Sequence, residues 1–527
     1  MLNVEHLSVS FVTRMGVTQA VDDVSFSVRA GEITAIIGES GSGKSVACYS
    51  LLGLVPQPPG RIDGGRALFN GRDLLKLPER ELRKVRGRDI AMIFQDPMTC
   101  LNPYMTIGKQ LVEPLRYHRK VSRKAARQRA MELLDEVGIR EPDKTFHNYP
   151  HEFSGGMRQR VMIAMALINE PRLLIADEPT TALDVTIQAQ ILQLLARLQK
   201  KRDIGIVLIS HDLAVVADIA DSIIVMQEGR VVERGDATAI FRAATHPYTH
   251  KLLAAIPRGS KPPRPASGEA LLEVRNLCTQ FGRGRHAVKA VDNVSFTIQR
   301  GETLGLVGES GSGKSTIGRS LLRLVEPDSG QVLFDGQDIT ALAPEALKRM
   351  RRRMQIIFQD PFASLNPRMT VFETLSEPLL LHGVADRGSV AGQVLSLMDA
   401  VGLARGFARK YPHEFSGGQR QRIAIGRALA TRPEFIVADE PVSALDVTIQ
   451  AQILELMGAL GREYGLTMLF ITHDLAVVRQ LADRIVVLRR GAIVEQATTA
   501  ELLTAPQDGY TRALLAATPG RGLRQTP

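Results

Sequence analysis

The sequence is poor in the residues that build metal and disulfide sites. It has only three cysteines, Cys48, Cys100 and Cys278, which lie far apart and form no metal-ligand pair. We interpret them as buried or incidental thiols in a reducing compartment. Zinc-finger spacings and basic strands studded with aromatic residues are also missing. The net charge of +10 therefore favours an acidic partner or an anionic surface, but it does not point to nucleic acid.

Long hydrophobic runs are absent as well. No apolar stretch approaches the roughly 18–20 residues that are needed to cross a bilayer. Residues 1–6 do not show the charged-then-apolar pattern of a signal peptide, so we expect the chain to stay in the cytosol. With 527 residues, 44% of them hydrophobic and 23% charged, the sequence predicts a globular protein of two or more domains.

The chain does contain one glycine-rich stretch twice. Residues 38–45, Gly-Glu-Ser-Gly-Ser-Gly-Lys-Ser, return unchanged as residues 308–315 and match the phosphate-binding pattern Gly, four residues, Gly-Lys-Ser/Thr. Each copy lies between an apolar run and a helical-looking segment, which is the setting that this motif requires. The glycines allow backbone amides to surround a phosphate, the lysine reaches its charge, and the serine hydroxyl is placed to coordinate Mg²⁺. The residues predicted to bind ATP here are Gly38, Ser40, Gly41, Gly43, Lys44 and Ser45, and in the second copy Gly308, Ser310, Gly311, Gly313, Lys314 and Ser315.

The repeat extends over most of the chain. Lys44 and Lys314 are 270 residues apart, and the later matching positions keep a constant spacing of 262 residues. Two copies of one domain, which differ by small deletions, explain this pattern. We expect the first domain at residues 1–258, a proline-rich linker at residues 259–270, and the second domain at residues 271–527. The pairs with the spacing of 262 are Ser154 and Ser416, Glu178 and Glu440, and His211 and His473.

Each domain opens with alternating apolar and polar residues, which predicts an antiparallel β layer. Phe11 and Phe281 occupy matching places in these segments. Each could stack on an adenine ring, because any base presents a π face, or it could be an ordinary core aromatic. The sequence leaves both interpretations open.

A glutamine follows the next apolar run of each domain. Residues 94–97 and 358–361 both read Phe-Gln-Asp-Pro, where the proline ends a strand. Gln95 and Gln359 are placed to coordinate Mg²⁺ and to sense the γ-phosphate, although a polar residue before a turn is common.

The segments that come next, residues 101–153 and 365–415, are predicted to be mostly helical. The first of them carries clusters of basic residues between positions 118 and 129. Such a cluster is usually a solvated helix face; the alternative is a docking face for a partner or for lipid headgroups.

Ser-Gly-Gly then opens an apolar helix in each domain, at Ser154-Gly155-Gly156 and at Ser416-Gly417-Gly418. A serine N-cap followed by bare amides is either an ordinary helix start or a second anion site. The recurrence at a fixed distance from the next motif favours the anion site.

Two apolar runs end in Asp-Glu-Pro, at Asp177-Glu178 and at Asp439-Glu440. Successive side chains of a strand point in opposite directions, so at the strand's end the two acids can separate. Asp177 and Asp439 suit a metal ion, whereas Glu178 and Glu440 suit a general base.

Two further apolar runs end in a histidine, His211 and His473. A lone histidine is usually structural. In an α/β domain that binds phosphate, however, ligands gather at the carboxyl ends of the strands, and both histidines are predicted to lie there.

With these motifs in this order, both domains resemble the ATP-binding domains of ABC transporters. Residues 94–103, 149–153 and 246–249 are similar to those of the dipeptide/oligopeptide/nickel importer branch, and the chain resembles two of its ATPase subunits fused, as in some peptide importers. The resemblance implies two tandem P-loop NTPase domains of α/β class, each with a mixed-sheet core, an antiparallel β layer and a helical subdomain. It implies ATP and Mg²⁺ as cofactors, the glutamates Glu178 and Glu440 as bases, and His211 and His473 as catalytic histidines.

The sequence departs from the family pattern in two places. Met157 replaces the usual glutamine of the Ser-Gly-Gly signature, but methionine is familiar in this branch, so we still expect activity. The region after His246 lacks the cysteine-rich tail of some relatives. We therefore expect no iron–sulfur cluster, and no zinc.

The function implied by the resemblance is ATP hydrolysis that powers the import of peptides or related small solutes. The two domains would pair head to tail, so that ATP closes two composite sites. The implied partners are two integral-membrane permease subunits and an extracytoplasmic solute-binding protein, with no nucleic acid, and the implied location is the cytoplasmic face of the inner membrane, as a peripheral subunit.

The alternative is a soluble tandem ABC ATPase that acts on ribosomes or nucleic acid. The short, proline-rich linker and the scattered cysteines argue against it. A regulatory module that does not hydrolyse ATP is less consistent with two intact Asp-Glu pairs.

Overall fold

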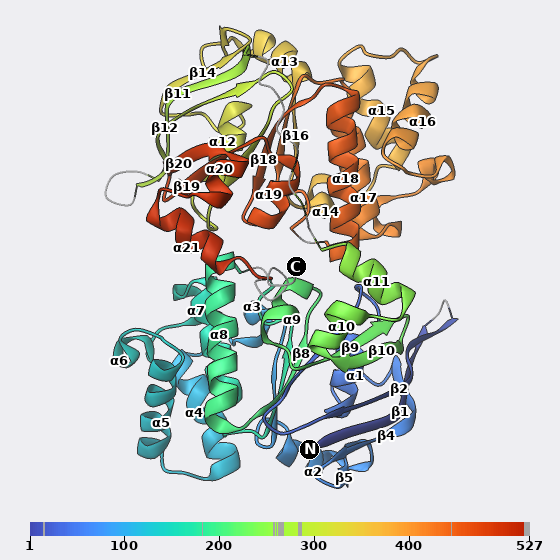
Figure 1. Ribbon diagram of the computed structural model, residues 1–527, viewed down its shortest axis with the longest axis vertical. Coiled ribbons are helices and arrows are strands. Elements are labelled where there is room, and N and C mark those ends of the chain that lie inside the picture. Colours follow the sequence, from blue (N-terminus) through green and yellow to red (C-terminus); the bar gives the residue numbers. More distant parts are fainter. Residues whose placement is uncertain are drawn as a thin grey trace. The chain divides into compact units, whose positions relative to one another are not determined.

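The computed structural model describes residues 1–13, 16–181, 183–256, 259, 261, 268–282, 287–443 and 445–520. The chain folds as two compact units (Figure 1). Unit one contains most of residues 1–256 and unit two most of residues 257–518. The linker expected at residues 259–270 lies largely outside the described residues, as do Arg14, Met15, Ala182 and Ala444.

Each unit begins with a four-stranded antiparallel sheet, as the alternating sequence predicts. The strand order is β2-β1-β4-β5 in unit one and β12-β11-β14-β15 in unit two. Val4, Leu7 and Val9 of β1 are buried, and the alternation of the strand is interrupted between Val4 and Leu7, where its pairing with β2 is irregular. The strands are β1 (Leu2–Thr13), β2 (Gly16–Val28), β4 (Gly60–Phe69) and β5 (Arg72–Asp73) in unit one, and β11 (Ala270–Phe281), β12 (Val288–Gln299), β14 (Ser329–Phe334) and β15 (Gln337–Asp338) in unit two.

A six-stranded sheet forms the centre of each unit. Its order is β10-β9-β3-β8-β7-β6 in unit one and β16-β17-β18-β13-β19-β20 in unit two, and only β10 and β20 run antiparallel. Every residue of β3 and β7 is buried, because layers cover both faces of a parallel sheet. The strands are β3 (Ile33–Ile37), β6 (Ile90–Ile93), β7 (Leu173–Asp177), β8 (Gly205–Ile209), β9 (Ser222–Gln227) and β10 (Arg230–Asp236), and in unit two β13 (Thr303–Val307), β16 (Met354–Ile357), β17 (Phe435–Asp439), β18 (Thr467–Thr472), β19 (Arg484–Arg489) and β20 (Ala492–Thr498).

Helices complete the core of unit one. The antiparallel sheet and α1 (Lys44–Leu51) bury a cluster of apolar side chains against one face of the central sheet. A second cluster lies between that sheet and the helices that follow the Gln95 segment, and a third packs α9 to α11 against β3 and β9. The remaining helices are α2 (Glu79–Val85), α3 (Pro97–Cys100), α4 (Ile107–Arg119), α5 (Arg123–Glu136), α6 (Pro142–Thr145), α7 (Gly155–Leu167), α8 (Val185–Arg202), α9 (Leu213–Ile219), α10 (Ala237–Ala243) and α11 (Pro247–Ala254), with short 3₁₀ turns η1 (Leu74–Lys76) and η2 (Pro150–Glu152).

Unit two repeats this arrangement, and the predicted fold class is confirmed. In both units the helical subdomain expected after the glutamine segment is present. No helix among the described residues of either unit is long and apolar enough to cross a membrane. The helices of unit two are α12 (Lys314–Leu321), α13 (Pro344–Arg353), α14 (Pro361–Ser364), α15 (Val371–Leu381), α16 (Val390–Ala400), α17 (Gly417–Leu429), α18 (Val447–Glu463), α19 (Leu475–Leu481), α20 (Thr499–Thr504) and α21 (Gly509–Ala517), with 3₁₀ turns η4 (Arg405–Arg409) and η5 (Pro412–Glu414).

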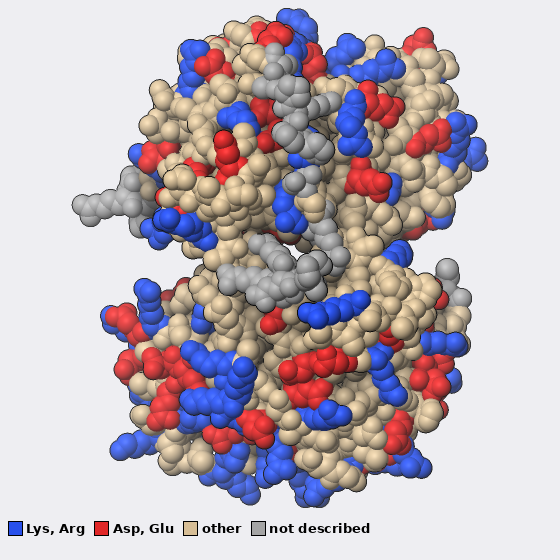
Figure 2. Space-filling model, viewed as in Figure 1, with Lys and Arg blue, Asp and Glu red and all other residues tan. Residues whose placement is uncertain are grey.

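The basic residues of the first helical segment make local contacts. Arg129 lies 2.8 Å from the carboxylate of Glu170, and the Arg127 guanidinium stacks 5.2 Å above the ring centre of Phe146. Figure 2 shows lysine and arginine side chains mixed with acidic ones over the visible face. These contacts favour a solvated helix face over a docking surface for lipid headgroups.

Candidate functional site

Each phosphate loop closes around its own lysine. Lys44 Nζ donates to the carbonyl oxygens of Gly38 and Glu39, at 2.9 and 2.8 Å. In unit two Lys314 Nζ makes the same two bonds, both at 2.8 Å. The two lysines are only 6% and 4% exposed, so each ammonium group is held inside a ring of backbone at the start of a helix. This is the geometry that a phosphate-binding loop needs.

The predicted metal carboxylate lies beside the loop's serine in both units. Ser45 Oγ donates to Asp177 Oδ1 at 2.9 Å, and Ser315 Oγ donates to Asp439 Oδ1 at 2.8 Å. The fold thus joins residues that are more than a hundred positions apart, because β7 and β3, like β17 and β13, end at the same edge of their sheet. Burial raises the pKa of Asp177 and of Asp439 above the usual range, because it disfavours the charged carboxylate.

The surroundings of Asp439 fit a bound Mg²⁺ ion. Its Oδ2 atom is buried and has no hydrogen-bond partner among the described residues. A buried carboxylate oxygen without a partner is costly, and a hard cation with oxygen ligands would satisfy it. In the described part of the chain, no group of three or more His, Cys, Asp or Glu side chains could hold a metal ion. We therefore expect the serine, the aspartate and the nucleotide's phosphates to share the ion, which neutralises charge on the phosphates when it is bound.

The second acid of each pair points to a different set of partners. Glu178 follows β7 with φ of 47°, a left-handed conformation that turns its side chain away from the strand's alternation. Its Oε2 accepts hydrogen bonds from Gln95 Nε2 at 2.8 Å and from Thr181 Oγ1 at 2.9 Å. Its Oε1 lies 3.0 Å from His211 Nδ1. The structure therefore gathers Gln95, Glu178 and His211 from three separate loops.

Unit two gathers the matching residues. Glu440 has φ of 45°, and its Oε2 lies 3.0 Å from Gln359 Nε2 and 3.4 Å from His473 Nδ1. Burial raises the pKa of Glu440, but the hydrogen bond and charge of His473 outweigh it, so the net pKa is below the usual range. Burial also raises the pKa of Glu178, but the contacts with His211, the hydrogen bond from Thr181 and the charge of Lys44 together lower it. Both glutamates are therefore ionised at neutral pH, as a general base must be.

The glutamines lie in loops rather than in strands. Strand β6 ends at Ile93, earlier than the sequence suggests, and Pro97 begins α3. Because residues 94–96 lie outside the sheet, the side-chain amide of Gln95 can reach Glu178. Coordination of Mg²⁺ by Gln95 and Gln359 stays a prediction.

The Ser-Gly-Gly turns cap their helices as expected. Ser154 Oγ accepts from Met157 N, and Ser416 Oγ from Gln419 N, both at 3.4 Å. Gln419 Oε1 also accepts from Ser416 N at 3.1 Å, which completes a capping box that Met157 cannot form. Ser154, Gly155, Ser416 and Gly417 are exposed, so the positive ends of α7 and α17 are open to an anion.

Phe11 and Phe281 do not belong to the buried core. Phe11 is half-buried, near the backbone of Gly60, and Phe281 is 48% exposed. The interpretation of both as core aromatics is therefore wrong. Stacking on the adenine ring stays a prediction.

The sequence did not point to two residues near the metal carboxylate and the base. Thr181 Oγ1 donates to Glu178, and Tyr49 lies close to the Asp177 carboxylate, with its ring edge-on to Phe94 at 6.1 Å. In unit two Arg319 takes the place of Tyr49. Comparison of the two copies therefore gave no signal for Tyr49.

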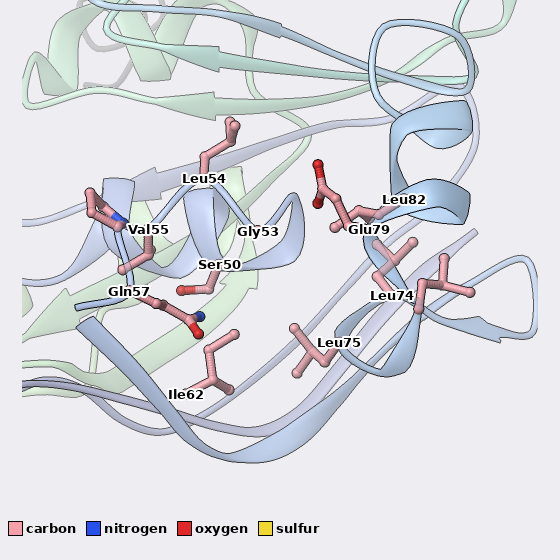
Figure 3. A pocket seen from close by; sticks show the side chains of 12 residues that line it. Ser50, Gly53, Leu54, Val55, Gln57, Ile62, Leu74, Leu75, Glu79 and Leu82 are labelled. Atoms are coloured by element: carbon pink, nitrogen blue, oxygen red, sulfur yellow. The ribbon is translucent and has the colours of Figure 1, made fainter. Parts of the chain in front are cut away.

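A cavity of about 570 Å³ lies away from these groups. It opens beside the end of α1, where Ile62 and Leu75 point toward the same space (Figure 3). None of the residues that line it is a predicted site residue, so the candidate site is the edge of the sheet and not this cavity.

A parallel sheet whose strand ends carry a phosphate loop, an Asp-Glu pair and a histidine defines a P-loop NTPase. The sequence profile described as "ABC transporter" matches residues 21–181 and 291–443. A second profile, "Oligopeptide/dipeptide transporter, C-terminal region", matches residues 232–284 and 494–525. The chain therefore belongs to the ABC transporter family.

Relatives match along nearly the whole chain. "Glutathione import ATP-binding protein GsiA" of Escherichia coli strain K12 is 49% identical over 556 residues, which cover 98% of this chain and 89% of the relative. "Peptidoglycan transport ATP-binding protein YejF" of Agrobacterium fabrum is 48% identical over 528 residues, covering 98% and 96%. The chain is thus an ATP-hydrolysing subunit of an ABC importer, and these relatives give no support to a soluble ATPase that acts on ribosomes or nucleic acid.

Proposed function

We propose that this chain powers the import of peptides or related small solutes by closing two composite ATP sites. One observation carries the proposal. Within each unit the phosphate loop, both acids, the glutamine and the histidine are gathered, whereas the first two residues of the signature turn are exposed and its serine bonds only locally. A signature supplied by the other unit would complete each site.

The proposed sites combine residues of both domains, residues 1–258 and 271–527, which the linker at residues 259–270 joins. Site one unites the loop and catalytic residues of the first domain with Ser416, Gly417 and Gly418. Site two unites those of the second domain with Ser154, Gly155 and Gly156. Because ATP would contact both faces at once, it binds the closed pair more tightly and shifts the population toward it.

Each chemical role follows from the geometry of one unit. Glu178, ionised and held by His211, would accept a proton from the attacking water, and Lys44 would stabilise the charge on the phosphates. The amide of Gln95, which touches Glu178, would link the nucleotide to the helical subdomain. In the second domain the same roles, in the same order, would fall to Glu440, His473, Lys314 and Gln359.

The partners proposed are two permease subunits in the inner membrane and an extracytoplasmic solute-binding protein. Tyr104 is 90% exposed and Phe362 is 60% exposed, and each follows its glutamine segment closely. We propose that the permease subunits contact the surfaces around Tyr104 and Phe362, on the cytoplasmic face of the membrane. Relatives named for glutathione import and for peptidoglycan transport support a peptide-like solute.

Co-purification tests the transport role. The full chain, isolated from detergent-solubilised cells, should carry integral-membrane subunits with it. Tyr104→Ala with Phe362→Ala should weaken this association, because two exposed aromatic side chains are removed. Isolation with ribosomes instead of membrane subunits would overturn the assignment.

Thiol crosslinking tests the composite sites. Cys100 and Cys278 are first replaced by serine, whereas Cys48 is fully buried and stays. We expect the pair Ser40→Cys and Ser416→Cys to react with a short crosslinker in the presence of ATP. The matched pair Ser40→Cys and Ser154→Cys lies within one domain and should not react. Reaction of this second pair alone would refute the head-to-tail arrangement.

A further inference from the structure

The last helix of each unit contacts that unit's own phosphate loop. Tyr248, in α11, places its hydroxyl 3.0 Å from the backbone nitrogen of Glu39 and accepts its hydrogen bond. In unit two Tyr510, in α21, accepts from the backbone nitrogen of Glu309 at 3.2 Å. The phosphate-loop motif and the fold of the central sheet do not require this contact, since the tyrosine lies about 200 residues further along the chain in each unit.

The bonded peptide group is the one that also holds the lysine. The N–H of Glu39 and the carbonyl of Gly38 belong to a single planar peptide group. Its oxygen accepts from Lys44 Nζ at 2.9 Å while its N–H donates to Tyr248. A rotation of this plane would therefore break both bonds at once, and the tyrosine hydroxyl fixes the direction from which the loop holds its ammonium group.

Tyr248 is itself firmly placed. It is 6% exposed and packs in the apolar cluster that includes Ile37, Val225 and Leu252. Glu233, in β10, accepts hydrogen bonds from the backbone nitrogens of Thr245 and His246, at 2.6 and 3.3 Å. Burial raises the pKa of Glu233, but the hydrogen bonds around it outweigh this and lower the pKa to about 2. Glu233 is therefore a carboxylate at neutral pH, and it holds the turn that precedes α11 and Tyr248.

Unit two reaches the same contact with different local residues. Glu495 anchors its loop through the backbone nitrogens of Gln507 and Asp508, at 2.8 and 3.1 Å. Asp508 caps α21, where His246 caps α11 in unit one. The Arg489 guanidinium stacks 4.8 Å above the Tyr510 ring. The N-cap residues of α11 and α21 differ, yet the tyrosine hydroxyl contacts the phosphate loop in both units. The contact is therefore not a by-product of one particular helix cap.

We propose that Tyr248 and Tyr510 are positioning residues for ATP, each fixing the loop peptide that orients the phosphate-binding lysine. The proposal rests on the proposed function, because it assumes that both loops bind ATP. It assigns a role to the region that matches the oligopeptide/dipeptide C-terminal profile: this region braces the phosphate loop on the side of the Gly-Glu peptide. The affinity for nucleotide then depends on a hydroxyl that does not touch it.

The test replaces both hydroxyls, as Tyr248→Phe with Tyr510→Phe in the full chain. A part-buried N–H is left without its acceptor in each loop, so the ATP dissociation constant and KM should rise about tenfold. The rate at saturating ATP should change less than about twofold, because no group that contacts the reacting atoms is lost. A fluorescent ATP analogue, competed with ATP, measures the binding, and the Mg²⁺–ATP-induced rise in melting temperature should shrink.

Tyr117→Phe with Tyr464→Phe is the matched control, since these tyrosines are 65% and 45% exposed and lie outside both loops. Its ATP affinity should equal that of the unaltered chain. If the tyrosine pair lowers the melting temperature without nucleotide but leaves KM unchanged, the residues are merely structural and the proposal fails. The single variants give the same comparison should the double variant not fold. Failure of the unaltered chain to bind ATP would instead overturn the proposed function.

Discussion

The chain that carries Glu178→Gln and Glu440→Gln should bind ATP yet hydrolyse it at least about a hundredfold more slowly than the unaltered chain. General-base catalysis contributes roughly 10²–10⁴-fold, and the amide cannot accept the proton. Gln95 and Gln359 lose a carboxylate partner, but the phosphate loops keep all their bonds. Steady-state phosphate release measures the rate, and retention of radiolabelled ATP after gel filtration measures the trapped complex.

The expected dependence on pH sharpens this prediction. Because His211 and His473 hold the pKa of the two glutamates below the usual range, both are fully ionised across the neutral range. Below the neutral range, the hydrolysis rate of the unaltered chain should fall toward that of the variant, as acid protonates Glu178 and Glu440. Glu132→Gln with Glu326→Gln, whose side chains are 51% and 68% exposed, is the control and should hydrolyse ATP normally. Brisk hydrolysis by the catalytic pair would contradict the assignment of the base.

Replacing Gly38 by alanine should abolish most nucleotide binding at site one. Gly38 has φ of 151°, a conformation that L side chains rarely adopt, and an added Cβ would lie 2.2 Å from the carbonyl oxygen of Met226 in β9. Strain and overpacking together cost about 2–4 kcal/mol, which the loop can relieve only by moving away from the sheet. Gly308 has φ of 158° and meets the carbonyl oxygen of Leu488 at the same distance, so Gly308→Ala should act alike at site two.

Gly41→Ala separates the clash from the backbone strain. Gly41 has φ of 78°, but an added Cβ would meet no atom within 4 Å. The free-energy cost of Gly41→Ala should stay near the roughly 1–2 kcal/mol that an L residue incurs in a left-handed conformation. Equilibrium binding of the fluorescent ATP analogue should rank the variants, with Gly38→Ala weaker by at least about tenfold than Gly41→Ala. Equal losses would mean that the approach of the loop to β9 is unimportant.

Much of the fold could be predicted from local patterns. The runs before residues 38 and 308 become β3 and β13, and Ser154 and Ser416 cap α7 and α17. These features depend on neighbours in sequence: apolar runs that pair into a buried sheet, and a hydroxyl that satisfies the first amides of a helix. Because the sequence contains two copies, each motif was supported by its counterpart at a constant spacing.

The orientation of the site residues could not be predicted in the same way. The left-handed backbone at Glu178 depends on the turn that follows β7, and the identity of Thr181 as a partner depends on that turn. Phe281 is exposed, although its strand has the pattern of a half-buried sheet. The contacts that favour a solvated face for the basic residues at 118–129 could not be predicted either, because Arg129 meets Glu170 and Arg127 meets Phe146 only in the folded chain.

By itself the sequence determined that the chain holds two phosphate loops, two Asp-Glu pairs and two signature turns, because each of these is a short run of residues whose chemistry is local. Only the tertiary structure decided that Tyr248 meets Glu39, that Gln95 meets Glu178, and that the Asp439 carboxylate is buried with one oxygen unpaired among the described residues. Such contacts depend on how strands and helices far apart in the chain pack against one another. The identity of one residue in such a contact does not predict which distant residue it will meet.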